Sequence, residues 1–173
     1  MVSDPEKLPG RSALIEFCHA AEANARDLIS DAEVLLEKER WPRAFALAVL
    51  AQEEFGKCLM AMVLAMASPD VVSAHLHELR SGHIRKLRSA LEHEALLGLP
   101  EGPPELLVSM DQIPEIARDG NDLKQWGFYV DISEDGSLRQ PSEIGEREAK
   151  AVVARVHKVV HPPGGLHSVP FWP

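Results

Sequence analysis

Residues 44–67 read AFALAVLAQEEFGKCLMAMVLAMA, an apolar stretch long enough to cross a bilayer. Three charged residues, Glu53, Glu54 and Lys57, stand at its centre. Each would cost about 2.5–3.5 kcal/mol inside a membrane, against a few tenths of a kcal/mol gained per Leu or Val. The stretch therefore predicts a helix buried in a protein core and not a membrane span. Trp41-Pro42 marks its start, because proline suits the first turn of a helix.

The residues on either side of this central helix also have helical periodicity. Apolar residues recur every three or four positions over 11–39, which predicts a helix with a single apolar face; they are Leu14, Cys18, Ala21, Ala25, Leu28, Ala32 and Leu35. Ser12 is its expected cap. Ser68-Pro69 predicts the start of a third helix over roughly 70–97, bent near Gly82.

The second half of the chain is rich in Gly and Pro and should be more broken. We expect a loop at 98–104, a short helix at 105–117 and a small hairpin or extended loop at 125–140. A last helix is expected over 143–161. The fold class is all-α, an up-and-down helical bundle of about four main helices with a small hairpin or loop insertion before the last one. One domain is expected, with a flexible N-terminus (1–10), the bundle (11–161) and an irregular tail (162–173).

Composition limits the classes of function. The chain has 18 Lys and Arg against 27 Asp and Glu, a formal net charge of -9, which argues against coating nucleic acid by bulk charge. Cys18 and Cys58 are too few for a disulfide scaffold, so we expect two buried, reduced thiols. The N-terminus MVSDPEKLPGRS is polar and lacks the apolar region of a secretory signal, so a cytoplasmic protein is expected.

The charged break in the central helix is the first candidate site. Glu53 and Lys57 are four residues apart, so they share a face and can pair. An ordinary helix ion pair is the alternative interpretation, but burial of charge is costly and favours a functional or network role. Gly56, in mid-helix, indicates close approach of another backbone or a ligand.

Two further candidates are basic. Residues 75–93 read HLHELRSGHIRKLRSALEH; His83 and Lys86 share a helix face, with Arg80 and Arg85 nearby, which suits a phosphate or an acidic ligand. Arg155 and His161 lie on the last helix, whose C-terminus should favour the protonated imidazole of a general acid. In each case a solvated helix surface is the alternative.

No metal or cofactor is expected. A di-iron bundle needs two Glu-x-x-His pairs, and Glu16-x-x-His19 is a single one. The chain also lacks the Cys-x-x-Cys spacing of a structural zinc site and the glycine-rich loops that bind nucleotides.

Several motifs in order resemble one known family. They are the Ala-rich helix ending in EEFGK, His83-x-x-Lys86, and the block DLKQWGFYVD (122–131) ahead of the last helix. Together they are similar to the abortive-infection AbiV family of the HEPN superfamily, over roughly residues 20–160. This resemblance implies an all-α HEPN-like bundle that acts in bacterial defence against phage. Many HEPN proteins are metal-independent ribonucleases that work as homodimers.

The resemblance also implies site residues. Glu53-x-x-x-Lys57 and Arg155-x5-His161 match the two elements of the HEPN signature. The blocks similar to AbiV point to His83, Lys86, Tyr129 and Asp131.

We weigh three hypotheses. In the first, the protein is an endoribonuclease: His83 or His161 transfers a proton, and Lys57, Lys86 and Arg155 stabilise charge on the phosphate. Glu53 or Glu54 orients Lys57, while Arg80, Arg85, Tyr129 and Asp131 contact RNA. Its basic residues in 75–93 and 146–161 should then line one cleft.

In the second hypothesis, a non-catalytic helical module binds and blocks a phage or host protein, in keeping with the acidic charge balance and the apolar tail 169–173. In the third, the polar residues form a structural network that fixes helix register without any ligand.

Overall fold

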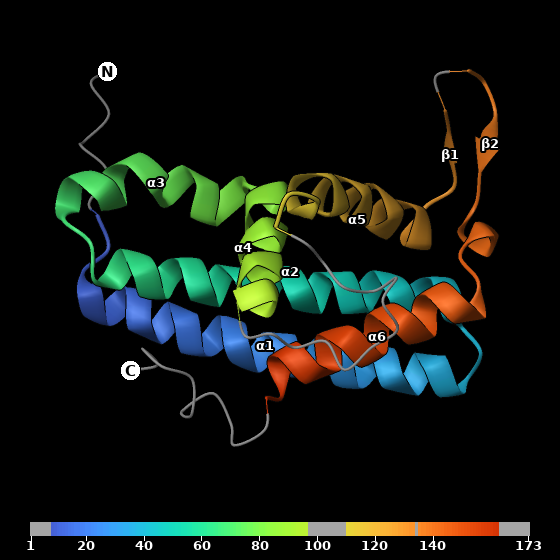
Figure 1. Cartoon of the computed structure of the whole chain (residues 1–173), viewed down its shortest axis with the longest axis horizontal. Helices are drawn as coiled ribbons and strands as arrows, with labels where there is room; N and C mark the ends of the chain where they lie inside the picture. Colours follow the sequence, from blue (N-terminus) through green and yellow to red (C-terminus); the bar gives the residue numbers. More distant parts are fainter. Residues whose placement is uncertain (1–7, 97–109, 134, 163–173) are drawn as a thin grey trace, which may run out of the picture.

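Two long helices, α1 (Arg11–Glu37) and α2 (Trp41–Ala65), lie side by side in opposite directions and form the base of the molecule (Figure 1). The computed structural model describes residues 8–96, 110–133 and 135–162. The predictions for residues 1–7, for the loop at 98–104, for 105–109 and for the tail 163–173 lie outside these ranges.

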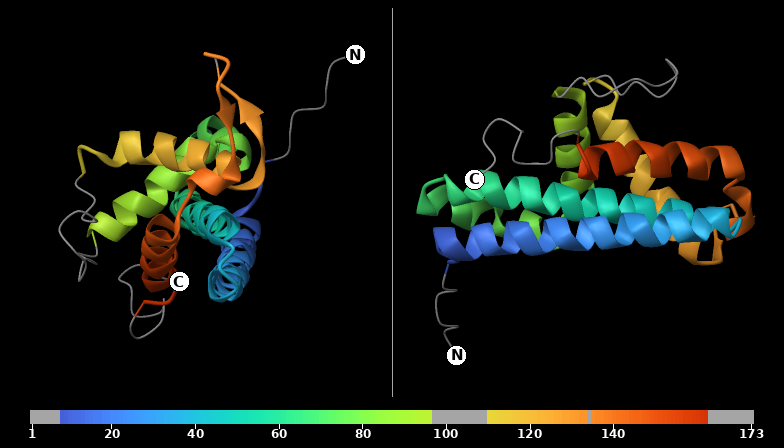
Figure 2. Two further views of the ribbon diagram at one scale, coloured as in Figure 1. Left: turned by 90° about the vertical axis from the view of Figure 1, so that its right-hand side faces the viewer. Right: turned by 90° about the horizontal axis from the view of Figure 1, so that it is seen from below.

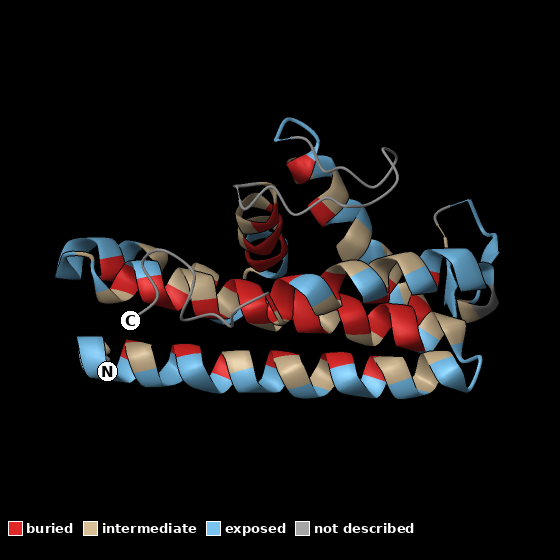
Figure 3. Cartoon of the chain, turned by 60° about the horizontal axis from the view of Figure 1, so that its bottom comes forward, coloured by how far each residue is buried: buried red, intermediate tan, exposed pale blue. Residues whose placement is uncertain are grey.

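Helix α1 buries one face, as its periodicity predicts. Leu14, Cys18, Ala21, Ala25 and Ala32 are buried, and the buried positions all face α2 in Figure 3. Ile29 is the fully buried residue where we expected Leu28. The Ser12 cap is wrong: the helix begins at Arg11, so Gly10 occupies the cap position and no side chain caps this end.

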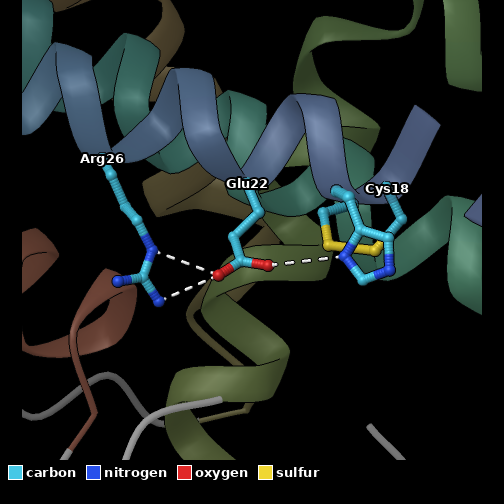
Figure 4. The surroundings of a disulfide bond; sticks show 5 residues. Cys18, Glu22 and Arg26 are labelled. Atoms are coloured by element: carbon cyan, nitrogen blue, oxygen red, sulfur yellow. Dashed lines mark hydrogen bonds and ion pairs between the residues drawn. A yellow bond between two sulfur atoms is a disulfide. The ribbon is translucent and has the colours of Figure 1, made fainter. Parts of the chain in front are cut away.

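The two cysteines are buried as expected, but the prediction of reduced thiols is wrong. Cys18 and Cys58 form a disulfide between α1 and α2 (Figure 4). The geometry of the helical hairpin explains the pairing, because both residues lie the same number of positions from Lys38 in the turn. Next to it on α1, the partly buried Glu22 pairs with Arg26 and with His19.

Helix α2 is buried on most of its circumference and contacts each of the other five α-helices of the described chain. Its apolar sequence therefore serves a protein core, as predicted. None of the helices in residues 8–96, 110–133 and 135–162 combines the length and the apolar character that a bilayer span requires.

The helix expected over 70–97 is divided into two. Helix α3 (Pro69–Ser81) begins after Ser68 with Pro69 in the first turn, as predicted, and runs along α2. Helix α3 ends at Gly82. The next helix, α4 (His83–Leu96), crosses α2 at a steep angle (Figures 1 and 2). The sequence indicated a bend at Gly82, and the structure turns the chain more sharply than a bent helix would.

The fifth helix lies later in the chain than expected. Helix α5 (Ile113–Phe128) includes residues 125–128, which the sequence predicts to be part of a small hairpin or extended loop. The strands β1 (Asp131–Ile132) and β2 (Leu138–Arg139) follow, and they pair in antiparallel fashion with Ile132 opposite Leu138. The predicted hairpin is thus present, but it begins at Asp131.

After a 3-10 turn, η2 (Pro141–Glu143), the described chain continues with α6 (Glu146–Val160), which packs along α1 and α2 (Figure 1). The all-α fold with a small hairpin before the last helix is confirmed. Over the described residues it comprises six α-helices, because the third predicted helix is divided and α5 is longer than expected.

Candidate functional site

Glu53 is a carboxylate inside the core of the protein. It lies on α2, and its side chain is only 3% exposed. A buried carboxylate is costly unless charged or hydrogen-bonding partners surround it. The groups that satisfy Glu53 therefore define the polar centre of this fold.

Three side chains from two other helices meet Glu53. Nδ1 of His83, in the first turn of α4, lies 2.6 Å from Oε1 of Glu53. Nζ of Lys124, on α5, donates a hydrogen bond of 2.8 Å to Oε2. Nζ of Lys86 lies 3.9 Å from Oε1, at ion-pair distance. We call Glu53, His83, Lys86 and Lys124 the Glu53 cluster.

The cluster keeps Glu53 ionised. Burial by itself raises the pKa of Glu53, but hydrogen bonds from Lys124 and His83, together with their charges, bring this pKa below its ordinary value. An ionised carboxylate only accepts hydrogen bonds, so Nδ1 of His83 carries the hydrogen in this contact.

Two glycines let the helices come close enough to build the cluster. A Cβ atom on Gly56 would lie 1.9 Å from the carbonyl oxygen of Lys86, so only glycine admits the first turn of α4 against α2. This confirms the close backbone approach predicted at Gly56. In α5, a Cβ atom on Gly127 would lie 2.6 Å from the carbonyl oxygen of Pro42, and Gly127 is three residues from Lys124.

His83 and Lys86 differ sharply in exposure. The His83 side chain is 58% exposed although its Nδ1 touches a buried carboxylate, whereas Lys86 is 1% exposed. Nζ of Lys86 also donates a 3.0 Å hydrogen bond to the carbonyl oxygen of Arg80. Burial lowers the pKa of Lys86, and the positive charge of Lys57 adds to this effect while Glu53 opposes it. His83 is thus the surface member of the cluster, and Lys86 an internal support.

Lys57 pairs with Glu54 and not with Glu53. Of the two carboxylates predicted to orient Lys57, Glu54 is therefore the one in contact with it. Both side chains are about one-fifth exposed, at the edge of the Glu53 cluster.

Arg155 belongs to a second buried polar group. Its Nη2 donates a 3.4 Å hydrogen bond to Oε1 of Gln52, and its Nε lies 3.8 Å from Oε1 of Glu94. Burial raises the pKa of Glu94, although the charge of Arg155 opposes this. Gln52 precedes Glu53 in the chain, but its contacts lead towards α6, away from His83.

His161 does not join either group. It ends α6, and its ring stacks on that of His157 with centroids 4.7 Å apart. The expectation of a readily protonated imidazole is wrong, because burial lowers the pKa of His161 and the charges of His157 and Arg26 lower it further. Arg155 and His161 thus match the HEPN spacing in sequence without meeting in the structure.

The four predicted RNA-contacting residues are all at the surface, in two places. Arg80 and Arg85 are exposed; the carbonyl oxygen of Arg80 accepts a hydrogen bond from Lys86 of the Glu53 cluster, whereas Nε of Arg85 lies 3.6 Å from a carboxylate oxygen of Glu78. Tyr129, 64% exposed, and Asp131 lie on the segment leading into the hairpin, which projects from the end of α5 in Figure 1. The structure therefore joins Arg80 to the cluster through its backbone, and it places Tyr129 and Asp131 on another part of the surface.

Lys124 is the member that we did not predict from sequence. It lies in the block DLKQWGFYVD, and the feature that could have identified it is its position relative to the apolar residues of this segment. The buried residues of α5 are Ile113, Ala117, Lys124 and Gly127, so this lysine lies on the apolar face of an amphipathic helix. A lysine at such a position indicates a buried anionic partner.

The comparisons with known proteins agree with this fold. The family model of AbiV (HEPN_AbiV) matches residues 13–161, most of the chain. Separate searches of curated proteins and of solved structures find no match. The match confirms the resemblance found in the sequence, and the chain belongs to the AbiV family, whose members are HEPN-type abortive-infection proteins.

Proposed function

We propose that this protein is an endoribonuclease in which His83 is the general base. The observation that carries the proposal is an exposed imidazole held 2.6 Å from a buried, ionised carboxylate, Glu53. A network that only fixed helix register would have no need to extend to a side chain that is 58% exposed. The family membership supports a role in defence against phage.

The contact with Glu53 sets the proton on the imidazole of His83. In the neutral imidazole, the hydrogen on Nδ1 that is donated to the carboxylate leaves Nε2 with a free lone pair, which can accept the proton of a ribose 2′-hydroxyl. The positive charge that then develops on the ring is stabilised by Glu53, as in catalytic triads. Lys124 and Lys86 hold Glu53 in place and keep it ionised.

The reaction needs no water as nucleophile. The 2′-oxygen attacks the adjacent phosphorus while the bond from phosphorus to the 5′-oxygen breaks. The 5′-oxygen takes up a proton from solvent, and the proton on Nε2 of His83 is later released to solvent. The products are a 2′,3′-cyclic phosphate and a 5′-hydroxyl end. Negative charge grows on the non-bridging oxygens, and nearby cations lower the barrier by stabilising it. We assign this role to Arg80 and Lys57, because Lys86 is almost completely buried.

The chemistry of the cleaved RNA tests this proposal. With EDTA present, the wild type should convert RNA to products that carry a 2′,3′-cyclic phosphate. A matched strand with a 2′-deoxy residue at the cleaved position should stay intact. Cleavage of the deoxy strand would contradict attack by the 2′-oxygen.

The Glu53→Gln variant tests the role assigned to the carboxylate. It keeps the shape of the side chain but cannot hold the charged imidazole, so cleavage should fall at least about tenfold. Unchanged cleavage by folded Glu53→Gln protein would contradict that role.

A second candidate function, binding of a phage or host protein, is favoured by two observations. The basic residues expected to line one cleft are divided between the surroundings of His83 and those of Arg155. The hairpin also exposes Val130, Ile132 and Leu138, each more than half exposed. Recovery of a specific protein partner that is lost on Ile132→Asp substitution, without cleavage of RNA, would favour this function.

We also propose, from the family resemblance, that the protein is a homodimer. Light scattering on the purified protein tests this directly, since a mass near 19.1 kDa would contradict it and twice that mass would support it.

A further inference from the structure

Two surface grooves of similar size border α3, one on each side, and they differ in charge. The groove towards α1 has a volume of about 340 Å³ and is lined by Leu14, Phe17, Lys57, Leu76, Leu79 and Arg80 among others. None of the described residues that line it carries a carboxylate. The groove towards α4 has about 330 Å³, and its lining includes the acidic Glu78 and Glu92. The groove towards α1, which we call the Phe17 groove, is therefore the one whose charge suits an anion.

The polar and apolar parts of the Phe17 groove come from different helices. Leu14 and Phe17 lie on α1, and Leu76 and Leu79 on α3, while the cations are Lys57 of α2 and Arg80 of α3. Phe17 is 40% exposed, so part of its ring surface is open to a ligand. Lys57 also pairs with Glu54, which does not line the groove.

This groove adjoins the Glu53 cluster. The carbonyl oxygen of Arg80 accepts a 3.0 Å hydrogen bond from Lys86, whose Nζ lies 3.9 Å from Glu53. Lys57 follows Glu53 by one helical turn, a rise of about 6 Å along α2. His83 follows Arg80 by three residues across the end of α3. The cationic part of the groove is thus the part next to the proposed base.

We propose that the Phe17 groove binds one nucleotide of a single-stranded RNA, with its base stacked on Phe17 and the neighbouring phosphate held by Lys57 and Arg80. This inference deepens the proposed function and rests on it for the placement of the scissile bond beside His83. An apolar groove with one accessible aromatic ring and two cations combines the two elements by which proteins bind single strands without reading sequence. A protein segment of mixed charge would be more complementary to the groove on the other side of α3, because that groove is lined by both acidic and basic side chains.

The test is binding of a fluorescein-labelled RNA hexamer, followed by fluorescence anisotropy. All variants are made in the full chain carrying His83→Ala, so that the RNA stays intact. Phe17→Ala should weaken binding at least about fivefold, the lower bound for loss of one base–aromatic stack. Phe17→Leu should weaken it similarly, because leucine keeps apolar bulk but has no aromatic face.

The dependence on salt separates the two parts of the groove. Arg80→Gln should weaken binding and reduce the slope of log affinity against log salt by about 0.7, the value for one phosphate contact on a single strand. Phe17→Ala should leave that slope unchanged. The controls are Val63→Ala, an exposed apolar residue of the other groove, and Arg147→Gln, which is 94% exposed on α6. Both should bind RNA as the parent does.

Unchanged RNA binding by Phe17→Ala and Arg80→Gln would overturn the inference, as would an equal loss in the two controls. Full binding by Phe17→Leu would also overturn it, because the ring would then not be stacked. If the wild type fails to cleave RNA while Phe17 and Arg80 still govern binding, the proposed reaction fails and the nucleotide site stands.

Discussion

Nζ of Lys124 lies 2.8 Å from Oε2 of Glu53, although the two residues are 71 positions apart in the chain. The two side chains are 4% and 3% exposed, so this ion pair between α5 and α2 is almost fully buried. The same carboxylate touches the exposed imidazole of His83 through its other oxygen. Through Glu53, Lys124 thus links the position of α5 to the hydrogen bond that orients the imidazole of His83, the proposed base.

Removing Lys124 should destabilise the fold strongly. In Lys124→Met the buried carboxylate of Glu53 loses its closest lysine, and breaking a buried pair typically costs about 3–5 kcal/mol. Urea unfolding at pH 7 measures the loss. The matched control is Lys150→Met, which removes an exposed lysine from a pair with Glu146 and should cost no more than about 1 kcal/mol. Equal losses in the two variants would mean that the buried pair has no special role.

The stability of the protein should fall in mild acid because of Glu53. Its pKa in the folded protein is below the ordinary value of 4.5, so the unfolded chain takes up the proton first as the pH falls. The stabilisation by the ionised group is complete well above pH 4.5 and is lost as the pH falls through the folded pKa. His83, Lys86 and Lys124 are the groups that favour the ionised form.

The control for this pH dependence is Glu53→Gln, which has no proton to bind at that position. It should be less stable than the wild type at pH 6 and should lose less stability between pH 6 and pH 3. Urea midpoints at several pH values measure both quantities. Parallel curves for wild type and variant would show that Glu53 does not contribute to the acid sensitivity.

Two glycine substitutions should have opposite signs. Gly56→Ala places a Cβ atom 1.9 Å from the carbonyl oxygen of Lys86, so α4 must move and the cluster is distorted. Overpacking of this kind costs about 1–3 kcal/mol, which exceeds the gain of about 1 kcal/mol from alanine in a helix. Gly120→Ala, in α5 with open space around it, should instead stabilise by up to about 1 kcal/mol. Stabilisation by both substitutions in thermal unfolding would contradict the close contact at Gly56.

Local pattern was enough to predict the helices that bury one continuous face. The stripe from Leu14 to Ala32 predicts α1 almost to its ends, and the apolar run with Pro42 predicts α2. The bounds of helix α5 could not be predicted in this way, because Lys124 and Gly127 interrupt its apolar face. The residues after Trp126 also favour strands. The sharp turn at Gly82 could not be predicted either, since a glycine within a helical pattern is equally compatible with a bent helix and with the end of one helix and the start of another.

The candidate site was predictable only in part, for a related reason. The charges of α2, and His83 with Lys86, stood out as polar residues on helices that carry apolar faces. Their pairing is set by contacts between helices, which no local period encodes. Glu53 accordingly contacts Lys124 in place of Lys57, and Cys58 forms a disulfide with Cys18 across the α1–α2 hairpin.

The rate of RNA cleavage by His83→Ala is the most direct test of the account. It should be measured with EDTA, at saturating RNA and in a single turnover, beside His77→Ala as control. His77 is an exposed histidine of α3 that contacts Ser81 on its own helix. We predict a rate about 10²- to 10⁴-fold below the wild type for His83→Ala, the usual contribution of a general base, and an unchanged rate for His77→Ala. Wild-type cleavage by folded His83→Ala protein would contradict the central claim that His83, held by Glu53, is the base.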